Sequence, residues 1–99
     1  MEYNALEVVL NIDGSPMKKD EDNDLILRDV AVRTLTLENN KKWPVVKCLD
    51  VAEKINKQDR FELDKSDADT LAQIIEDGEV FLPFIKARCI RMLKKEDKE

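Results

Sequence analysis

Apolar residues recur at helical spacing in four segments of this 99-residue chain, and this pattern constrains the fold more than any other feature. The first segment is expected to form a helix that begins between residues 25 and 29 and ends at the polar run 39–42. Its buried stripe is Leu27, Val30, Ala31, Thr34 and Leu35. A second helix is expected after Pro44, with the stripe Val45, Cys48, Leu49, Ala52 and Ile55. Both helices have charged residues on the opposite side and should pack on one shared core.

The third and fourth helices are predicted from their ends as well as from their stripes. Either Asp64 or Ser66 can cap the third helix, and Gly78 is placed to follow its last turn. Its stripe is Ala68, Leu71, Ala72 and Ile75. The fourth helix is expected from about Leu82 to Lys95, with Pro83 in its first turn. Its stripe is Ile85, Cys89, Met92 and Leu93, widened by Phe84 and Ile90.

The residues before the first helix favour extended structure. Residues 6–12 alternate imperfectly and predict a strand, residues 13–16 (Asp-Gly-Ser-Pro) predict a turn, and residues 17–19 can form a short returning strand. Residues 60–63 predict a further short strand or an extended connector. The fold class is therefore predicted as α+β and mostly helical: an N-terminal β-hairpin-like element followed by about four amphipathic helices. We expect one domain over residues 1–99, with an acidic loop at residues 20–24 and a disordered tail at residues 96–99.

Composition argues against an enzyme. Histidine is absent, which removes the usual neutral-pH general base and the commonest metal ligand. Cys48 and Cys89 both lie on apolar stripes, so we expect them to be reduced and buried. The two glycines are far apart and form no phosphate-binding loop. We therefore predict no catalytic residue and no cofactor. The N-terminus lacks the basic start of a signal peptide, and no run approaches the roughly 18 apolar residues of a membrane span, so a cytosolic location is expected.

The acidic loop invites comparison with a calcium-binding loop. Asp20, Asp22 and Asp24 have the spacing of the first three ligands of an EF-hand. However, Leu25 stands where that loop requires glycine, and Ala31 stands where it requires a bidentate glutamate. We therefore predict no metal site and a solvated acidic loop.

Charge is unevenly distributed in a chain whose net charge is −5. Residues 59–79 carry eight acidic and two basic residues, whereas the closing helix is basic. The bases of that helix can complement the helix dipole and the acidic third helix, form a protein-binding surface, or contact nucleic acid. Trp43 likewise has two explanations: a hydrophobic staple at the start of the second helix, or an exposed anchor for a partner. The candidate partner-binding residues are Trp43, Lys41, Lys42, Lys86, Arg88, Arg91, Lys94 and Lys95.

Taken in order, these segments resemble a group of small proteins encoded by tailed bacteriophages and prophages. The resemblance rests on the turn within residues 10–17, the helical patterns of residues 27–35 and 49–55, the strand and cap of residues 61–67, and the apolar closing helix. The heavily acidic segment from Glu62 to Glu79 and the basic last helix depart from the group. The resemblance implies a phage context in a bacterial cell and transfers no catalytic residue.

These observations together predict a non-enzymatic phage or prophage accessory protein that acts by protein–protein interaction. Its partner would be a phage structural protein or a host protein, so it would serve as an assembly factor or as a modulator of a host process. A homodimer that buries residues 81–85 is a further possibility. The alternative function is a nucleic-acid-binding regulator that uses the basic closing helix, although the net negative charge opposes phosphate binding.

Overall fold

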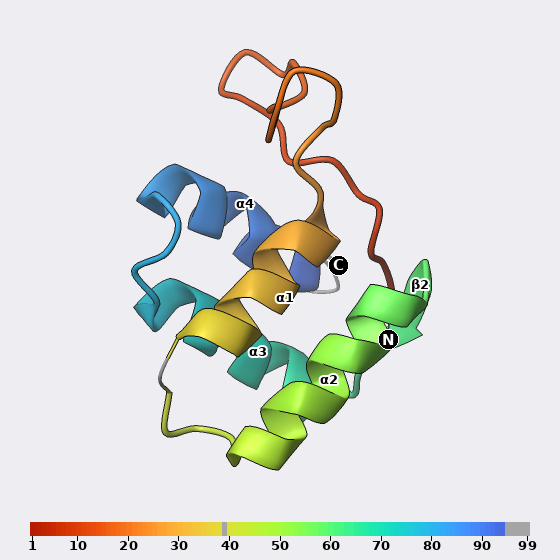
Figure 1. The fold of residues 1–99 in the computed structure, drawn as a ribbon, viewed down its shortest axis with the longest axis vertical. Coiled ribbons are helices and arrows are strands. Elements are labelled where there is room, and N and C mark those ends of the chain that lie inside the picture. The colour runs from red at the N-terminus through yellow and green to blue at the C-terminus, as the bar shows by residue number, and fades with distance from the viewer. Residues whose placement is uncertain (39, 95–99) are drawn as a thin grey trace.

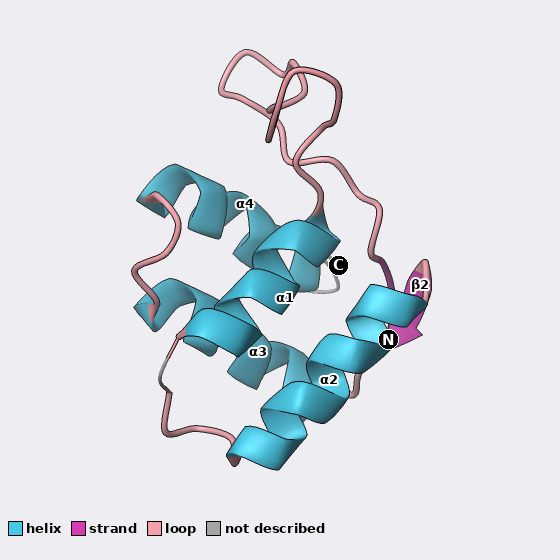
Figure 2. Cartoon of the chain, in the orientation of Figure 1, coloured by secondary structure: helices cyan, strands magenta, loops and turns pink. Residues whose placement is uncertain are grey.

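The computed structural model describes residues 1–38 and 40–94, and it shows four helices and one two-stranded sheet (Figures 1 and 2). The helices are α1 (Leu27–Leu37), α2 (Val45–Lys57), α3 (Lys65–Asp77) and α4 (Pro83–Leu93). The strands β1 (Glu2–Asn4) and β2 (Arg60–Glu62) pair antiparallel. The predicted α+β, mostly helical fold class is therefore confirmed. The predicted tail at residues 96–99 lies outside the described residues.

Helix α1 occupies the centre of the fold and contacts each of the other three helices. Its buried residues are Leu27, Val30, Ala31, Thr34 and Leu35, which is the stripe predicted from the sequence. The predicted stripe of α3 is also buried, together with Ile74. In α4, Ile85, Cys89 and Leu93 are buried, while Met92 packs on the core and is only partly covered. Among the described residues, no helix has both the length and the apolar character needed to cross a membrane.

The predicted stripe of α2 is partly wrong. Val45 is 83% exposed and Leu49 is 54% exposed, whereas Val51 is buried with Cys48, Ala52 and Ile55. Residues 48, 51, 52 and 55 follow one helical face, and Leu49 lies about 100° away from Cys48 on that helix. The helix is therefore turned relative to the prediction and leaves two large apolar side chains in solvent.

The sheet joins the start of the chain to its middle. Tyr3 of β1 pairs with Phe61 of β2, and both side chains are buried with ring centroids 5.6 Å apart. The Tyr3 hydroxyl also donates a hydrogen bond to the Leu93 carbonyl at 3.1 Å. A single buried tyrosine thus connects β1 to the end of α4. The sequence predicted β2 but not its partner, because three residues of β1 carry no alternating pattern.

The predicted strand over residues 6–12 does not form as a continuous strand. Instead, the backbone N–H of Val9 donates to the Leu25 carbonyl, that of Leu25 donates to Met17, and that of Met17 donates to Val9, at 2.7–2.8 Å. These three equally spaced residues close a ring of hydrogen bonds. Isolated antiparallel bridges flank the ring (Leu10 with Pro16, Lys18 with Asp24, and Val8 with Ile26). The chain therefore leaves the ring as two short hairpin-like loops.

The predicted turn and cap residues have mixed outcomes. Gly14 has φ of 90°, which confirms the turn, and the Asp64 side chain rather than Ser66 caps α3 by accepting from the Asp67 N–H at 2.7 Å. Gly78 ends α3 as predicted, but its φ of −73° is open to any residue. An added Cβ there would lie 2.9 Å from the Glu38 carboxylate, so that side chain would have to move.

Candidate functional site

A hollow of about 710 Å³ follows the solvent-facing side of α1. Helix α1 supplies Arg28, Asp29, Val32, Arg33, Thr36 and Leu37. The loops before α1 close one end of the hollow with Met17, Lys18, Lys19 and Leu25. Its flanks come from Asn56 of α2, from Phe81 just before α4, and from Ile85 in the first turn of α4. We name this surface the α1 groove.

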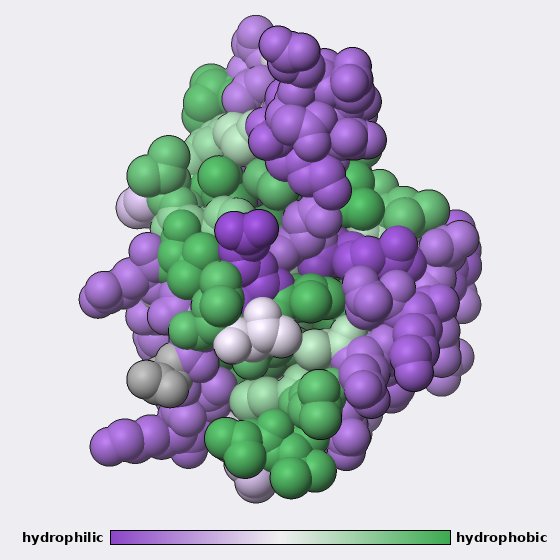
Figure 3. Space-filling model, viewed as in Figure 1, coloured by the Kyte–Doolittle hydropathy of each residue, from purple (hydrophilic) through white to green (hydrophobic). Residues whose placement is uncertain are grey.

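The groove has an apolar floor. Val32, Met17 and Phe81 are partly buried against the core, and Leu37 at the end of α1 is 63% exposed. Beside the groove, Leu82 is 69% exposed. Figure 3 shows this face, with hydrophobic surface along the connection between α3 and α4 and over the first turns of α2. An apolar hollow next to exposed leucines is typical of a surface that binds another chain.

Three of the four basic residues in the groove are already paired. Lys18 forms an ion pair with Asp24 at 2.8 Å, and Lys19 forms one with Asp29 at 3.1 Å. Arg28 binds the Asp59 carboxylate at 3.1 Å and the carbonyls of Ile55 and Gln58 at 3.0 Å.

Arg33 differs from these three. The residue is exposed, and its guanidinium has neither an ion pair nor a hydrogen bond with any residue that the structure describes. The α1 groove therefore presents one uncommitted guanidinium beside an apolar floor, which suits an apolar ligand segment that also carries a carboxylate.

Trp43 is not exposed to a partner. It is only 8% exposed and lies directly before Pro44, the residue at the N-cap of α2. Cys48, four residues into the helix, is buried, and its Sγ lies 3.9 Å from the Trp43 carbonyl oxygen. Lys47 lies over the indole ring at 5.1 Å from its centroid. This is the arrangement of a hydrophobic staple, so the expectation of an exposed anchor is corrected.

The predicted basic residues do not form one surface. Lys41 and Lys42 are exposed beside the C-terminal end of α3, in a hollow that also contains Gly78. Lys86, Arg91 and Lys94 line a separate hollow between α3 and α4. Lys95 lies outside the described residues.

Two of the basic side chains of α4 serve the fold. The Lys86 ammonium donates to the carbonyls of Glu76 and Gly78 at 3.0 and 2.8 Å, and so satisfies the end of α3. The Arg88 guanidinium donates to the Asn11 carbonyl at 2.9 Å and lies over the Phe84 ring. The exposed basic residues here are therefore Arg91 of α4 and Lys94, which directly follows the helix.

No metal-binding cluster is found among the described residues. No group of three or more histidine, cysteine, aspartate or glutamate side chains there is placed to hold a metal ion. Both cysteines are free and buried, as expected. Burial, aided by the negative charge of Glu7, raises the pKa of the Cys89 thiol to about 12, which keeps it protonated and a poor nucleophile.

Sequence reasoning missed the α1 groove. The available signal was the pair Val32 and Leu37, which are apolar but lie outside the buried stripe of α1. A search of protein-family profiles, curated proteins and solved structures found no match for this chain.

Proposed function

We propose that this chain is a non-enzymatic accessory protein of a tailed phage or prophage, and that it binds another protein in the bacterial cytoplasm through the α1 groove. The observation that carries the proposal is the uncommitted Arg33 beside the apolar floor formed by Val32, Leu37 and Phe81. The phage context rests on the sequence resemblance alone. The partner segment is expected to be amphipathic, with apolar residues for the floor and a carboxylate for Arg33.

Energetics favour such a segment over a small ligand. The groove is open along the length of α1, so its contacts are spread over several turns of helix. Burial of partly exposed leucine and phenylalanine side chains contributes roughly 25 cal/mol per Å² of apolar surface removed from water. A charge-assisted hydrogen bond from Arg33 would then select the register of the bound segment.

The experiment compares the wild type with a groove variant and a matched control. The groove variant carries Arg33→Glu and Leu37→Asp, both at exposed positions. The control carries Arg91→Glu, which reverses another exposed helical arginine outside the groove. Each tagged protein is used to capture partners from cells that carry the phage, and the captured proteins are quantified by mass spectrometry.

We expect a protein that the wild type and the Arg91→Glu control both retain and that the groove variant loses by tenfold or more. A photoreactive residue at position 37 should crosslink to an acidic, apolar segment of that same protein. A phage capsid or tail component would assign the chain to assembly, and a host protein would assign it to modulation of the host. Equal capture by the wild type and the groove variant would disprove binding through the α1 groove.

Nucleic-acid binding by α4 is the less favoured alternative. Lys86 and Arg88 already donate to backbone carbonyls, which leaves fewer cations for phosphate contacts. Affinity that rests on phosphate contacts falls steeply with added salt. Binding to DNA or RNA that weakens in this way, and that Arg91→Glu reduces but the groove variant does not, would favour this alternative over the α1 groove.

A further inference from the structure

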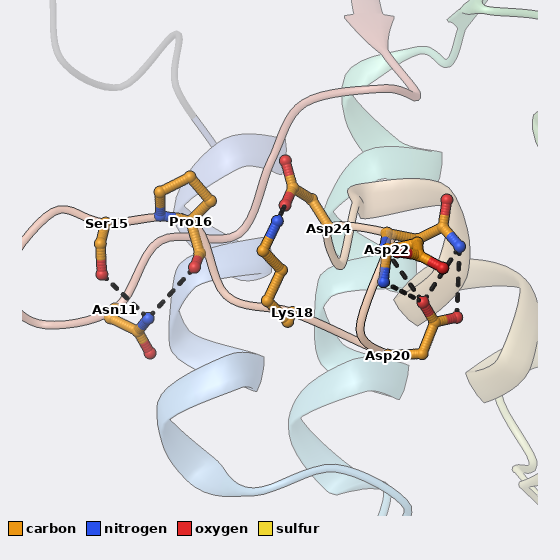
Figure 4. Close-up of polar contacts among 8 residues, drawn as sticks. Asn11, Ser15, Pro16, Lys18, Asp20, Asp22 and Asp24 are labelled. Atoms are coloured by element: carbon orange, nitrogen blue, oxygen red, sulfur yellow. Dashed lines mark hydrogen bonds and ion pairs between the residues drawn. The ribbon is translucent and has the colours of Figure 1, made fainter.

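The two loops that leave the N-terminal hydrogen-bond ring project from one end of the molecule (Figure 1). The first, residues 10–16, is named here the tip loop, and the second contains the acidic loop of residues 20–24. Figure 4 shows them on either side of the ion pair between Lys18 and Asp24. Because the ring and its flanking bridges fix the base of both loops, their ends are held in a defined position.

The tip loop holds Ile12 in solvent on an ordered turn. The Asn11 side-chain amide donates to the Ser15 hydroxyl and to the Pro16 carbonyl, at 3.2 and 3.3 Å. The Asp13 carboxylate accepts from the N–H and the hydroxyl of Ser15, at 3.0 and 2.7 Å. Arg88 fixes the loop to α4 through the Asn11 carbonyl. Ile12, 82% exposed, is therefore presented on a preorganised support, which lowers the entropic cost of binding.

The surroundings of Ile12 are acidic. Asp13 lies next to it in the tip loop, and the neighbouring acidic loop exposes Asp20, Glu21 and Asp22. An apolar tip with carboxylates beside it has the chemistry expected of an α1 groove ligand, an apolar group together with a partner for Arg33. The complementarity is therefore present within one chain, on two different surfaces.

We propose that the loop end of one copy, with Ile12 at its tip, binds in the α1 groove of a second copy. This inference rests on the proposed function of the groove and names a second copy of the chain as its partner. The contact is proposed as head-to-tail, with one loop end and one groove used in each pair of copies. Each bound copy still offers a free loop end and a free groove, so association continues into a ring or a filament.

The experiment uses the purified chain in sedimentation velocity over a wide range of concentrations. A loop variant carries Ile12→Asp, and a groove variant carries Arg33→Glu with Leu37→Asp. All three positions are exposed, and circular dichroism verifies the fold of each variant. A control carries Val46→Asp, at a position of α2 that is 64% exposed and outside the groove.

We expect the wild type and the Val46→Asp control to grow beyond dimers as concentration rises, and each of the other two variants to remain monomeric. An equimolar mixture of the loop variant and the groove variant should form a dimer and stop there. In that dimer the intact loop end of the groove variant occupies the intact groove of the loop variant. A two-fold contact, in which each copy's loop end enters the other's groove, would instead stop the wild type at a dimer and would overturn the head-to-tail arrangement.

A wild type that stays monomeric at all concentrations would overturn the self-association. A mixture that fails to form the dimer would overturn the head-to-tail contact. Neither result would contradict the proposed function of the groove. The Ile12→Asp variant tests that function separately, because its groove is intact. If that variant still captures a different protein and the groove variant does not, the proposed function holds, and sedimentation alone decides whether the chain also self-associates.

Discussion

The Glu38 carboxylate lies where a side chain on Gly78 would begin, 2.9 Å from the position of its Cβ. Its Oε2 atom accepts hydrogen bonds from the backbone N–H groups of Glu79 and Val80, at 2.7 and 2.6 Å. Glu38 directly follows α1, and Gly78 directly follows α3. This one contact therefore fixes the connection between α3 and α4 against the end of α1, beside the α1 groove.

Gly78→Ala is expected to destabilise the protein by about 1–2 kcal/mol. The added methyl displaces the Glu38 carboxylate and removes two charge-assisted hydrogen bonds, whose net value is reduced here because they are exposed. Urea unfolding measures the loss. In a Glu38→Ala background the same change should cost much less, because the obstructing group is gone. An equal cost in both backgrounds would show that Glu38 is not the reason for glycine.

Local patterns predicted the helices well because the residues that form each stripe or cap all lie within one short segment. The buried face of α1 and the Asp64 cap are examples. The sequence did not predict contacts between distant segments, such as the pairing of Tyr3 with Phe61 or the approach of Glu38 to Gly78. These depend on how the helices are placed in space, which a periodicity does not encode.

The site was predicted less well for the same reason. Whether Trp43 faces the core or solvent depends on the rotation of α2, and that rotation also exposed Val45 and Leu49. The cationic residues of α4 were visible in the sequence, but their carbonyl partners on α3 and the tip loop were not. The α1 groove forms where loops, α1 and the start of α4 meet. The pattern of no single segment therefore predicts it.

Trp43→Ala is expected to cost about 3–5 kcal/mol of unfolding free energy, because it empties a buried site of a large aromatic ring. Trp43→Phe should cost less, since it keeps part of the contact with the start of α2. Denaturant unfolding compares both variants with Leu82→Ala, a change at a 69% exposed residue that should stay within roughly 0.5 kcal/mol. A stable Trp43→Ala protein would contradict the staple.

The acidic loop is expected to remain ordered at pH values at which an aspartate with an ordinary pKa would already be protonated. The Asp20 carboxylate accepts from the Asp22 N–H at 2.9 Å and from the Asn23 side chain at 3.0 Å, and these bonds lower the pKa of Asp20 below 3.8. Because the pKa is lower in the folded loop, its stabilising contribution is present above the unfolded pKa and is lost as pH falls through the lowered value.

Carboxyl chemical shifts in NMR measure this pKa. The Asp20 midpoint should lie below 3.8 in the intact chain and return towards that value in an isolated peptide of residues 16–26. Asp13 should behave in the same way when the chain is compared with a peptide of residues 8–18, because hydrogen bonds from Ser15 lower its pKa. Identical midpoints in the chain and in the peptide would show that these turns are not formed in solution.

Cys89 is expected to be unreactive until the protein unfolds. Its side chain is fully buried, and burial raises its pKa from 9.0 to about 12, with a further contribution from the charge of Glu7. In a Cys48→Ser variant, the remaining thiol should react with a disulfide reagent at the rate of global unfolding and should respond to urea as that rate does. Fast labelling in native buffer would place the thiol near the surface.

The raised pKa of Cys89 also predicts a loss of stability in alkali. Above pH 9 the thiol ionises in the unfolded chain but not in the folded one, so the unfolded state releases protons and is favoured as pH rises. The full difference is worth roughly 4 kcal/mol by pH 12, and part of it should appear by pH 10.5. Other groups titrate in this range, so the Cys89→Ala variant is the reference. Its unfolding free energy should fall less steeply between pH 9 and pH 10.5 than that of the wild type, and parallel curves would contradict a buried neutral thiol.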